Sequence, residues 1–208
     1  MPTIDKLACS LNRRDEKPNV ELAIQISNKK DKAAVKELIG LLDHKSKDIQ
    51  ADAIKVLYEI GALQPSLIKA DTMKFIGLLG SKNNRIVWGA MTAIDSITSE
   101  NPKQVYDNLP QILDAVEKGS VITGDRAVSI ILKLSSVKQY ADESFILFID
   151  ILKACPANQF PMYAENALGI INDKNRPSFI NVLQARIKEL EKESSRKRVE
   201  KVLKKLSP

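Results

Sequence analysis

Aromatic residues are scarce in this chain: they make up 5% of its 208 residues, and Trp88 is the only tryptophan. Aromatic residues favour strands, whereas Leu, Ala, Lys and Glu, which are frequent here, favour helices. No apolar run approaches the roughly 20 residues that a membrane-spanning helix needs. The N-terminal residues also lack the apolar core of a secretion signal. The composition therefore predicts a helical protein with no membrane partner.

Residues that carry chemistry are equally few. The single histidine, His44, lies among lysines in an expected turn, and Cys9 and Cys155 each lack a second cysteine nearby. Such isolated cysteines form neither a metal site nor a redox pair, and free thiols are typical of a reducing cytoplasm. The sequence contains no glycine-rich phosphate loop and no nucleophile–histidine–acid set. We therefore expect a cytoplasmic protein that is not an enzyme and binds no metal or cofactor.

The positive charge is concentrated at the C-terminal end. The net charge is +6, and the segment from Arg186 onward contains nine Lys and Arg against four Glu, so the rest of the chain is nearly neutral. A basic stripe along the whole molecule, as expected for a nucleic-acid-binding surface, is not evident. The simpler interpretation of the last segment is an end-capping helix with a solvated basic face. The possible contacts to an anion or a nucleic acid are Arg196, Lys197, Arg198, Lys201, Lys204 and Lys205.

A 37-residue repeat organises the chain. Residues 38–60 align with residues 75–97 without a gap, and eight of the 23 aligned positions are identical. Around each copy, apolar residues recur at spacings of one face of an α-helix. The same offset carries one alanine through four copies, as Ala53, Ala90, Ala127 and Ala164. An alanine at the same place in every copy indicates a helix packed closely against its neighbour.

Each repeat has a second helical segment before the aligned stripe, and short polar turns join the segments. Such turns favour antiparallel helix pairs. Pro110 falls inside the first helix of the third repeat, where we expect a kink. We expect a single domain, 1–208, with N-terminal capping helices at 1–29, repeats at 30–62, 63–100, 101–137 and 138–173, and a basic C-terminal capping pair at 174–208.

The segment AVKELIGLLDHKSKDIQADAIKVLYEIGA, residues 34–62, resembles a HEAT repeat. The family pattern has a Leu-rich end to the first helix, an Asp in the turn, and small residues inside the second helix. The matching residues are Leu38, Leu41, Leu42, Asp48, Ile49, Ala53, Leu57, Ile60 and Gly61. The arginine usual in the second helix is absent, since Gln50 stands there. The resemblance implies an all-α fold: a right-handed α-α superhelix of stacked antiparallel pairs, an armadillo-type solenoid, with about 10–12 helices.

In HEAT-like stacks the second helices line a concave groove. The positions opposite the apolar stripe therefore become candidates for binding. Trp88 occupies one of them, and an exposed tryptophan is a typical binding anchor. The alternative is that Trp88 folds over Lys55 or a neighbouring helix and shields the core. The candidate partner-binding residues in the groove are Lys55, Tyr58, Trp88, Asp95, Asp125, Arg126 and Met162.

Two functions are compatible with this pattern. The first is a non-enzymatic interaction scaffold or adaptor that binds a protein or peptide in its groove, as a monomer by default. The second, less favoured, is nucleic-acid binding, either through the basic last helix or in the manner of the HEAT-like alkylpurine DNA glycosylases. Those enzymes use aromatic residues, an Asp and an Arg in the groove. The resemblance would assign Trp88 to the aromatic residue and Arg126 to the Arg, but the position of the Asp would fall on Thr92.

Overall fold

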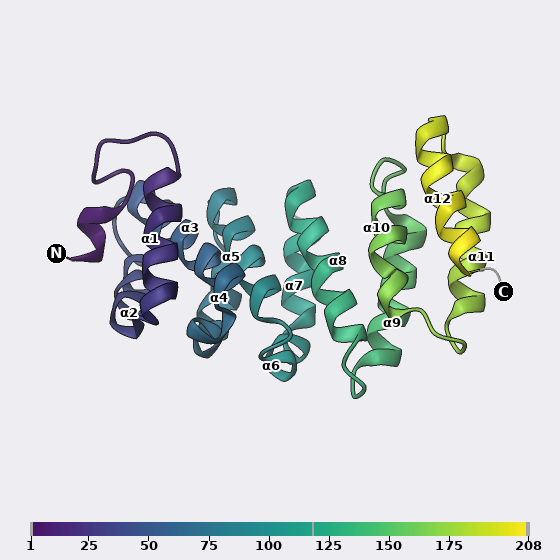
Figure 1. Ribbon diagram of the computed structural model, residues 1–208, viewed down its shortest axis with the longest axis horizontal. Coiled ribbons are helices and arrows are strands. Elements are labelled where there is room, and N and C mark those ends of the chain that lie inside the picture. The colour runs from purple at the N-terminus through teal and green to yellow at the C-terminus, as the bar shows by residue number, and fades with distance from the viewer. Residues whose placement is uncertain (1, 118, 207–208) are drawn as a thin grey trace. The chain divides into compact units, whose positions relative to one another are not determined.

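The computed structural model describes residues 2–117 and 119–206, and within them every regular element is a helix (Figure 1). Among these residues, none of the helices combines the length and hydrophobicity needed to span a membrane. The α-helices are α1 (Lys17–Lys29), α2 (Lys32–Leu41), α3 (Lys47–Leu63), α4 (Thr72–Leu78), α5 (Asn84–Ile97), α6 (Pro102–Asp107), α7 (Leu109–Glu117), α8 (Val121–Ser135), α9 (Ala141–Ala154), α10 (Phe160–Asn166), α11 (Arg176–Arg186) and α12 (Glu193–Leu206). Short 3-10 helices are η1 (Thr3–Lys6), η2 (Pro65–Leu67), η3 (Lys69–Asp71), η4 (Ala167–Ile170) and η5 (Ile187–Glu189).

The chain forms two compact units, Met1–Ala127 and Val128–Pro208, and the boundary falls inside α8. In the first unit, α3 packs between α1 and α5, and α2 and α4 pack on α3 and α5 respectively. In the second unit, α10 packs against α12, and α9 packs against α11. Each unit thus has one layer of first helices and one layer of second helices. We call α1, α3 and α5 the second-helix layer of the first unit.

The repeating alanines lie in the core. Ala53, Ala90 and Ala164 are fully buried, and Ala127 is 1% exposed. The second-helix layer is closely packed at Gly89 in α5, where an added Cβ would lie 2.8 Å from Cγ1 of Ile54 in α3. A side chain at this position would therefore push the two helices apart.

Local sequence signals explain where several helices begin and end. Asp31 and Ser46 are N-cap residues whose side chains accept backbone N–H groups in the first turns of α2 and α3. Such caps satisfy donors that have no partner within the helix. The expected kink at Pro110 is instead a break, since α6 ends at Asp107 and α7 begins at Leu109. Proline lacks an N–H and clashes with the carbonyl four residues earlier, so it fits only in the first turn of a new helix.

The N-terminal pair is incomplete, because its first helix is only the short η1. The Glu37 carboxylate on α2 fastens η1 by accepting three hydrogen bonds, from Thr3 N at 2.8 Å, Thr3 Oγ1 at 2.6 Å and Ile4 N at 3.3 Å. Residues 7–16, here called the N-terminal loop, then cross to α3, where Cys9 N donates to Asp52 Oδ2 at 2.7 Å. The N-terminal loop therefore covers the start of the second-helix layer.

Candidate binding surface on the second helices

Trp88 lies on the outward side of α5 but is not freely exposed. It is half-buried, and its ring centroid lies 5.7 Å from that of Tyr58 on α3, with the two planes tilted by 50°. Such a tilted arrangement is a favourable aromatic contact. Trp88 therefore leans on the neighbouring helix while part of its surface faces solvent.

The expectation that Tyr58 and Asp95 lie open in the groove was wrong. Tyr58 is 8% exposed and Asp95 is 5% exposed. Tyr58 lies beneath Trp88 and the Lys55 ammonium, which is 4.8 Å from the Tyr58 ring centroid. Arg126 extends over Asp95, with Nη1 3.2 Å from Oδ2. A residue of α5 thus covers Tyr58, and a residue of α8 covers Asp95, so contacts between helices bury them.

Lys55 is held in place from several sides. Its side chain is only 12% exposed, and its Nζ lies 2.8 Å from Glu59 Oε1 and 2.9 Å from Glu16 Oε2. Burial by itself would lower the pKa of the Lys55 ammonium, but the interactions with Glu59, Tyr58 and Glu16 raise it above its ordinary value. Lys55 is therefore a fixed positive charge beside the aromatic pair.

Glu16, at the end of the N-terminal loop, connects Lys55 to a second cation. Its Oε1 lies 3.1 Å from Nη2 of Arg85, in the first turn of α5. Glu16, Lys55, Tyr58, Arg85 and Trp88 thus form one continuous set of contacts, here called the Trp88 cluster. Arg85 precedes Trp88 by three residues, a spacing that the sequence shows. Glu16 joins the cluster only through the path of the loop, which no local pattern indicates.

The other groove candidates lie around or apart from this cluster. Arg126 is partly exposed with its guanidinium on Asp95, and Asp125 beside it is half-buried. Thr92, one turn after Trp88, donates its hydroxyl proton to the Trp88 carbonyl at 2.9 Å. Met162 is half-buried on α10 and belongs to the second unit, not to the Trp88 cluster.

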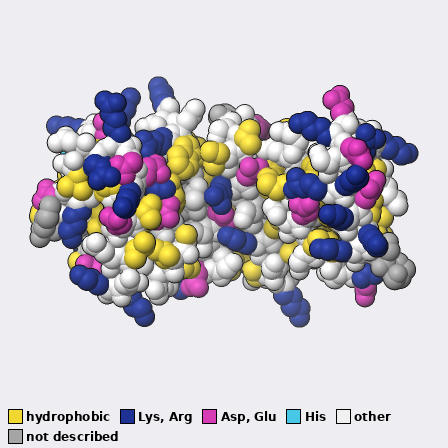
Figure 2. Space-filling view, turned by 45° about the horizontal axis from the view of Figure 1, so that its top comes forward, with side chains coloured by type: hydrophobic (Ala, Val, Ile, Leu, Met, Phe, Trp, Pro, Cys, Tyr) yellow, Lys and Arg dark blue, Asp and Glu magenta, His cyan; other side chains and the backbone are white. Residues whose placement is uncertain are grey.

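The basic residues of α12 divide into two groups. Arg198 binds Glu165 on α10 through two hydrogen bonds of 2.9 and 2.6 Å, and this contact lowers the pKa of the Glu165 carboxyl. Lys197 pairs with Glu193, and Arg196 donates to the Glu191 carbonyl. The exposed residues Lys201, Lys204 and Lys205 make no ion pair within the described residues. Figure 2 shows Lys and Arg side chains gathered over these C-terminal helices, with acidic side chains among them.

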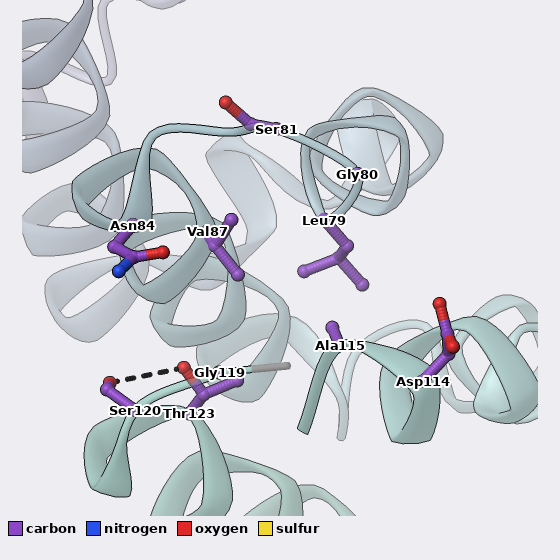
Figure 3. A pocket seen from close by; sticks show the side chains of 10 residues that line it. All are labelled: Leu79, Gly80, Ser81, Asn84, Val87, Asp114, Ala115, Gly119, Ser120 and Thr123. Atoms are coloured by element: carbon purple, nitrogen blue, oxygen red, sulfur yellow. Dashed lines mark hydrogen bonds between the residues drawn. The ribbon is translucent and has the colours of Figure 1, made fainter. Parts of the chain in front are cut away.

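A small cavity of about 160 Å³ lies at the turns beside α5, in the first unit (Figure 3). Leu79, Val87 and Ala115 form its apolar wall, and the hydroxyls of Ser120 and Thr123 lie 3.4 Å apart on another side. Nothing in this lining is a nucleophile paired with a base. Within residues 2–117 and 119–206, no three His, Cys, Asp or Glu side chains gather where they could hold a metal ion. His44 instead stabilises its own turn, since its Nδ1 accepts from Ser46 N at 3.0 Å.

The sequence matches no protein-family model and no curated protein. The fold does match solved structures. A designed armadillo repeat protein in complex with peptide (KR)4 has a TM-score of 0.67 and 15% identity, over 99% of this chain and 98% of that chain. A structure of computationally designed armadillo repeat proteins for modular peptide recognition has a TM-score of 0.65 and 14% sequence identity, over 97% of both chains. An engineered protein has a TM-score of 0.64 and 18% sequence identity, over 99% of this chain and 97% of that chain. The chain therefore has the expected all-α, HEAT/armadillo-type repeat fold.

Proposed function

We propose that this chain is a non-enzymatic interaction protein that binds an extended peptide or protein segment on the second-helix layer of its first unit. The observation that carries the proposal is the half-buried Trp88, fixed against Tyr58. A tryptophan that already has its bound orientation loses little conformational freedom when a ligand covers it. Aromatic residues of this kind supply much of the energy of many interfaces.

The residues that follow Trp88 suit a peptide backbone. The hydroxyl of Thr92, one turn after Trp88, donates to the Trp88 carbonyl at 2.9 Å. The lone pairs of a hydroxyl that has already donated its proton are available to accept an N–H from a ligand. Small side chains also leave room for a backbone to approach the helix. Trp88 would thus bind a large side chain, while Thr92 accepts a hydrogen bond.

The solved structures support a peptide as the partner. One designed armadillo repeat protein is in complex with peptide (KR)4, and others were designed for modular peptide recognition. The sequence of that cationic peptide does not transfer to this chain, because Lys55 and Arg85 are themselves cations on the proposed surface. The ligand of this chain is therefore expected to differ in charge.

The proposal can be tested with the protein's own fluorescence, since Trp88 is the only tryptophan. Random 12-residue peptides displayed on phage would be selected on the full chain, and synthetic copies of the enriched peptides titrated while Trp88 emission is recorded. We expect a change in emission when a peptide binds the wild type. Trp88→Ala removes the fluorophore, so wild type and variant would be compared by isothermal titration calorimetry, in which the variant should bind at least about tenfold more weakly, as expected for a hot-spot residue.

The matched control is Met73→Ala, which removes another large side chain of the first unit that is 48% exposed. It should leave binding unchanged, and circular dichroism should show that both variants stay folded. Peptides that bind the Trp88→Ala variant as well as the wild type would remove Trp88 from the site. A selection that enriches no peptide would count against the function itself.

The nucleic-acid alternatives have less support. Three of the six basic side chains of α12 already contact acidic side chains or a carbonyl, which leaves three exposed lysines. For a glycosylase-like site, Arg126 is engaged by Asp95, and Thr92 is not an acid. Binding to DNA that weakens steeply as salt is added would revive the first alternative.

A further inference from the structure

The Glu16 carboxylate occupies a site made by two cations from successive helices of the second-helix layer. Its two oxygens lie 2.9 Å from Lys55 Nζ and 3.1 Å from Arg85 Nη2. We propose that Lys55 and Arg85 form a receptor for an acidic side chain of the bound peptide, and that Glu16 is its internal competitor. This inference rests on the proposed function and adds the chemistry of the partner.

The Lys55 side of the receptor keeps its place when Glu16 leaves. Lys55 remains held by Glu59 at 2.8 Å and by the ring of Tyr58 at 4.8 Å, and its side chain is mostly buried. Arg85, in contrast, has Glu16 as the one ion-pair partner that the described residues provide. Removal of Glu16 therefore leaves the positive charge of Arg85 uncompensated beside the fixed ammonium of Lys55, and a carboxylate satisfies such a charge best.

Glu16 is also easy to displace. Its side chain is 43% exposed, and it stands at the junction between the N-terminal loop and α1, where it forms no side-chain cap. Its pair with Arg85 is exposed on both sides, and exposed ion pairs are individually weak, so a ligand carboxylate loses only a few-fold in affinity to Glu16 at Arg85. The hydrogen bond from Cys9 N to Asp52 Oδ2 holds an earlier part of the N-terminal loop, seven residues before Glu16. The Glu16 side chain can therefore move away without release of the whole loop.

The position of the receptor next to Trp88 defines the ligand further. The Lys55 ammonium lies 4.8 Å from the Tyr58 centroid, which lies 5.7 Å from the Trp88 centroid, so ammonium and indole are at most about 10.5 Å apart. An extended peptide covers this distance in about three residues. The preferred partner is therefore a segment with Asp or Glu within about three residues of a large apolar residue.

The test compares the wild type with Glu16→Gln, which keeps the size of the side chain and removes its charge. The same displayed library of random 12-residue peptides would be selected on each protein. Peptides from both selections should be rich in Asp and Glu near an apolar residue. A synthetic acidic peptide should bind Glu16→Gln about three- to tenfold more tightly than wild type, and Arg85→Gln more weakly.

Two matched controls isolate the effect. Glu21→Gln makes the same charge change at an exposed position of α1, where the carboxylate is 3.8 Å from Lys17, and should leave affinity unchanged. The amide version of the peptide, with its acid replaced by Asn or Gln, should bind wild type and Glu16→Gln equally. If peptides that depend on Trp88 show no preference for acidic residues, or if Glu16→Gln and Glu21→Gln have the same affinity for the acidic peptide, the receptor proposal is wrong while the proposed function stands. If no peptide depends on Trp88, the function itself fails.

Discussion

Replacement of Gly89 by alanine should destabilise the first unit, although alanine is the better helix former. An added Cβ would lie 2.8 and 3.1 Å from Cγ1 and Cγ2 of Ile54, where ordinary contacts begin near 3.4 Å. Ile54 is 1% exposed and β-branched, so it has neither space nor an alternative rotamer to relieve the clash. The α3 and α5 helices would have to separate.

The size of the effect follows from two opposing contributions. Overpacking a tight core costs about 1–3 kcal/mol, and alanine for glycine inside a helix returns about 1 kcal/mol. We therefore expect Gly89→Ala to lower the free energy of unfolding by about 1 kcal/mol. Gly77→Ala is the matched control, because a Cβ at Gly77 in α4 would meet nothing within 4 Å. In this control the free energy of unfolding should rise by up to about 1 kcal/mol, so the stabilities of the two variants should differ by roughly 2 kcal/mol.

Thermal unfolding followed by circular dichroism at the helix band measures this difference, which corresponds to roughly 4–8 °C for a chain of this length. A double-mutant cycle then assigns the cause. Ile54→Ala removes the two atoms that clash, so Gly89→Ala should be harmless or stabilising in the Ile54→Ala background. Equal melting temperatures for Gly77→Ala and Gly89→Ala, or strict additivity in the cycle, would refute the close packing of α3 on α5.

Two other predictions concern the ends of the units. Burial alone would raise the pKa of Glu37, but hydrogen bonds from Thr3 and Ile4 lower it below its ordinary value. A carboxyl whose pKa is lower in the folded state stabilises the fold above the unfolded pKa of about 4.3, and this stabilisation is lost as the pH falls through the folded pKa. Glu37→Gln should therefore be less stable than wild type at pH 7 and equal to it in acid; a constant gap at all pH values in denaturant titrations would contradict this. Arg186 donates to two carbonyls near the end of α9 at 2.8 Å each and lies 4.7 Å from the Phe160 ring centroid. Both of these bonds come from Nη1, while Nε donates to Glu189 Oε2 at 3.0 Å. Lysine has one nitrogen and no planar group, so Arg186→Lys should lower the free energy of unfolding in urea by roughly 1–3 kcal/mol. A wild-type midpoint would show that the second donor and the planar group are dispensable.

The fold was readable from the sequence because its signals are local. The 37-residue offset placed Ala53, Ala90, Ala127 and Ala164 on one helical face each, and all four are buried. The break at Pro110 was expected as a kink, because a proline pattern alone does not reveal whether the helix resumes in the same direction. Periodicity thus predicts which face of a helix is buried, and predicts its ends less well.

The candidate site was harder to predict from the sequence, because it depends on contacts between helices. A helical wheel places Tyr58 and Asp95 away from the apolar stripe, but it does not show that the next helix covers them. Trp88 was identified, and the alternative that it leans on a neighbouring helix describes its contact with Tyr58. Glu16 was missed, because it reaches Lys55 across 39 residues through a loop without periodicity.

The buried alanines that recur every 37 residues have a consequence for how this chain can change in length. Each inserted residue turns a helix by about 100°, so a single insertion inside α3, α5 or α8 would rotate its alanine out of the contact. Insertion of a whole 37-residue copy keeps every alanine in phase. Natural variants should therefore differ by entire repeats, or by a few residues in the turns between helices, and seldom by a residue or two within a helix.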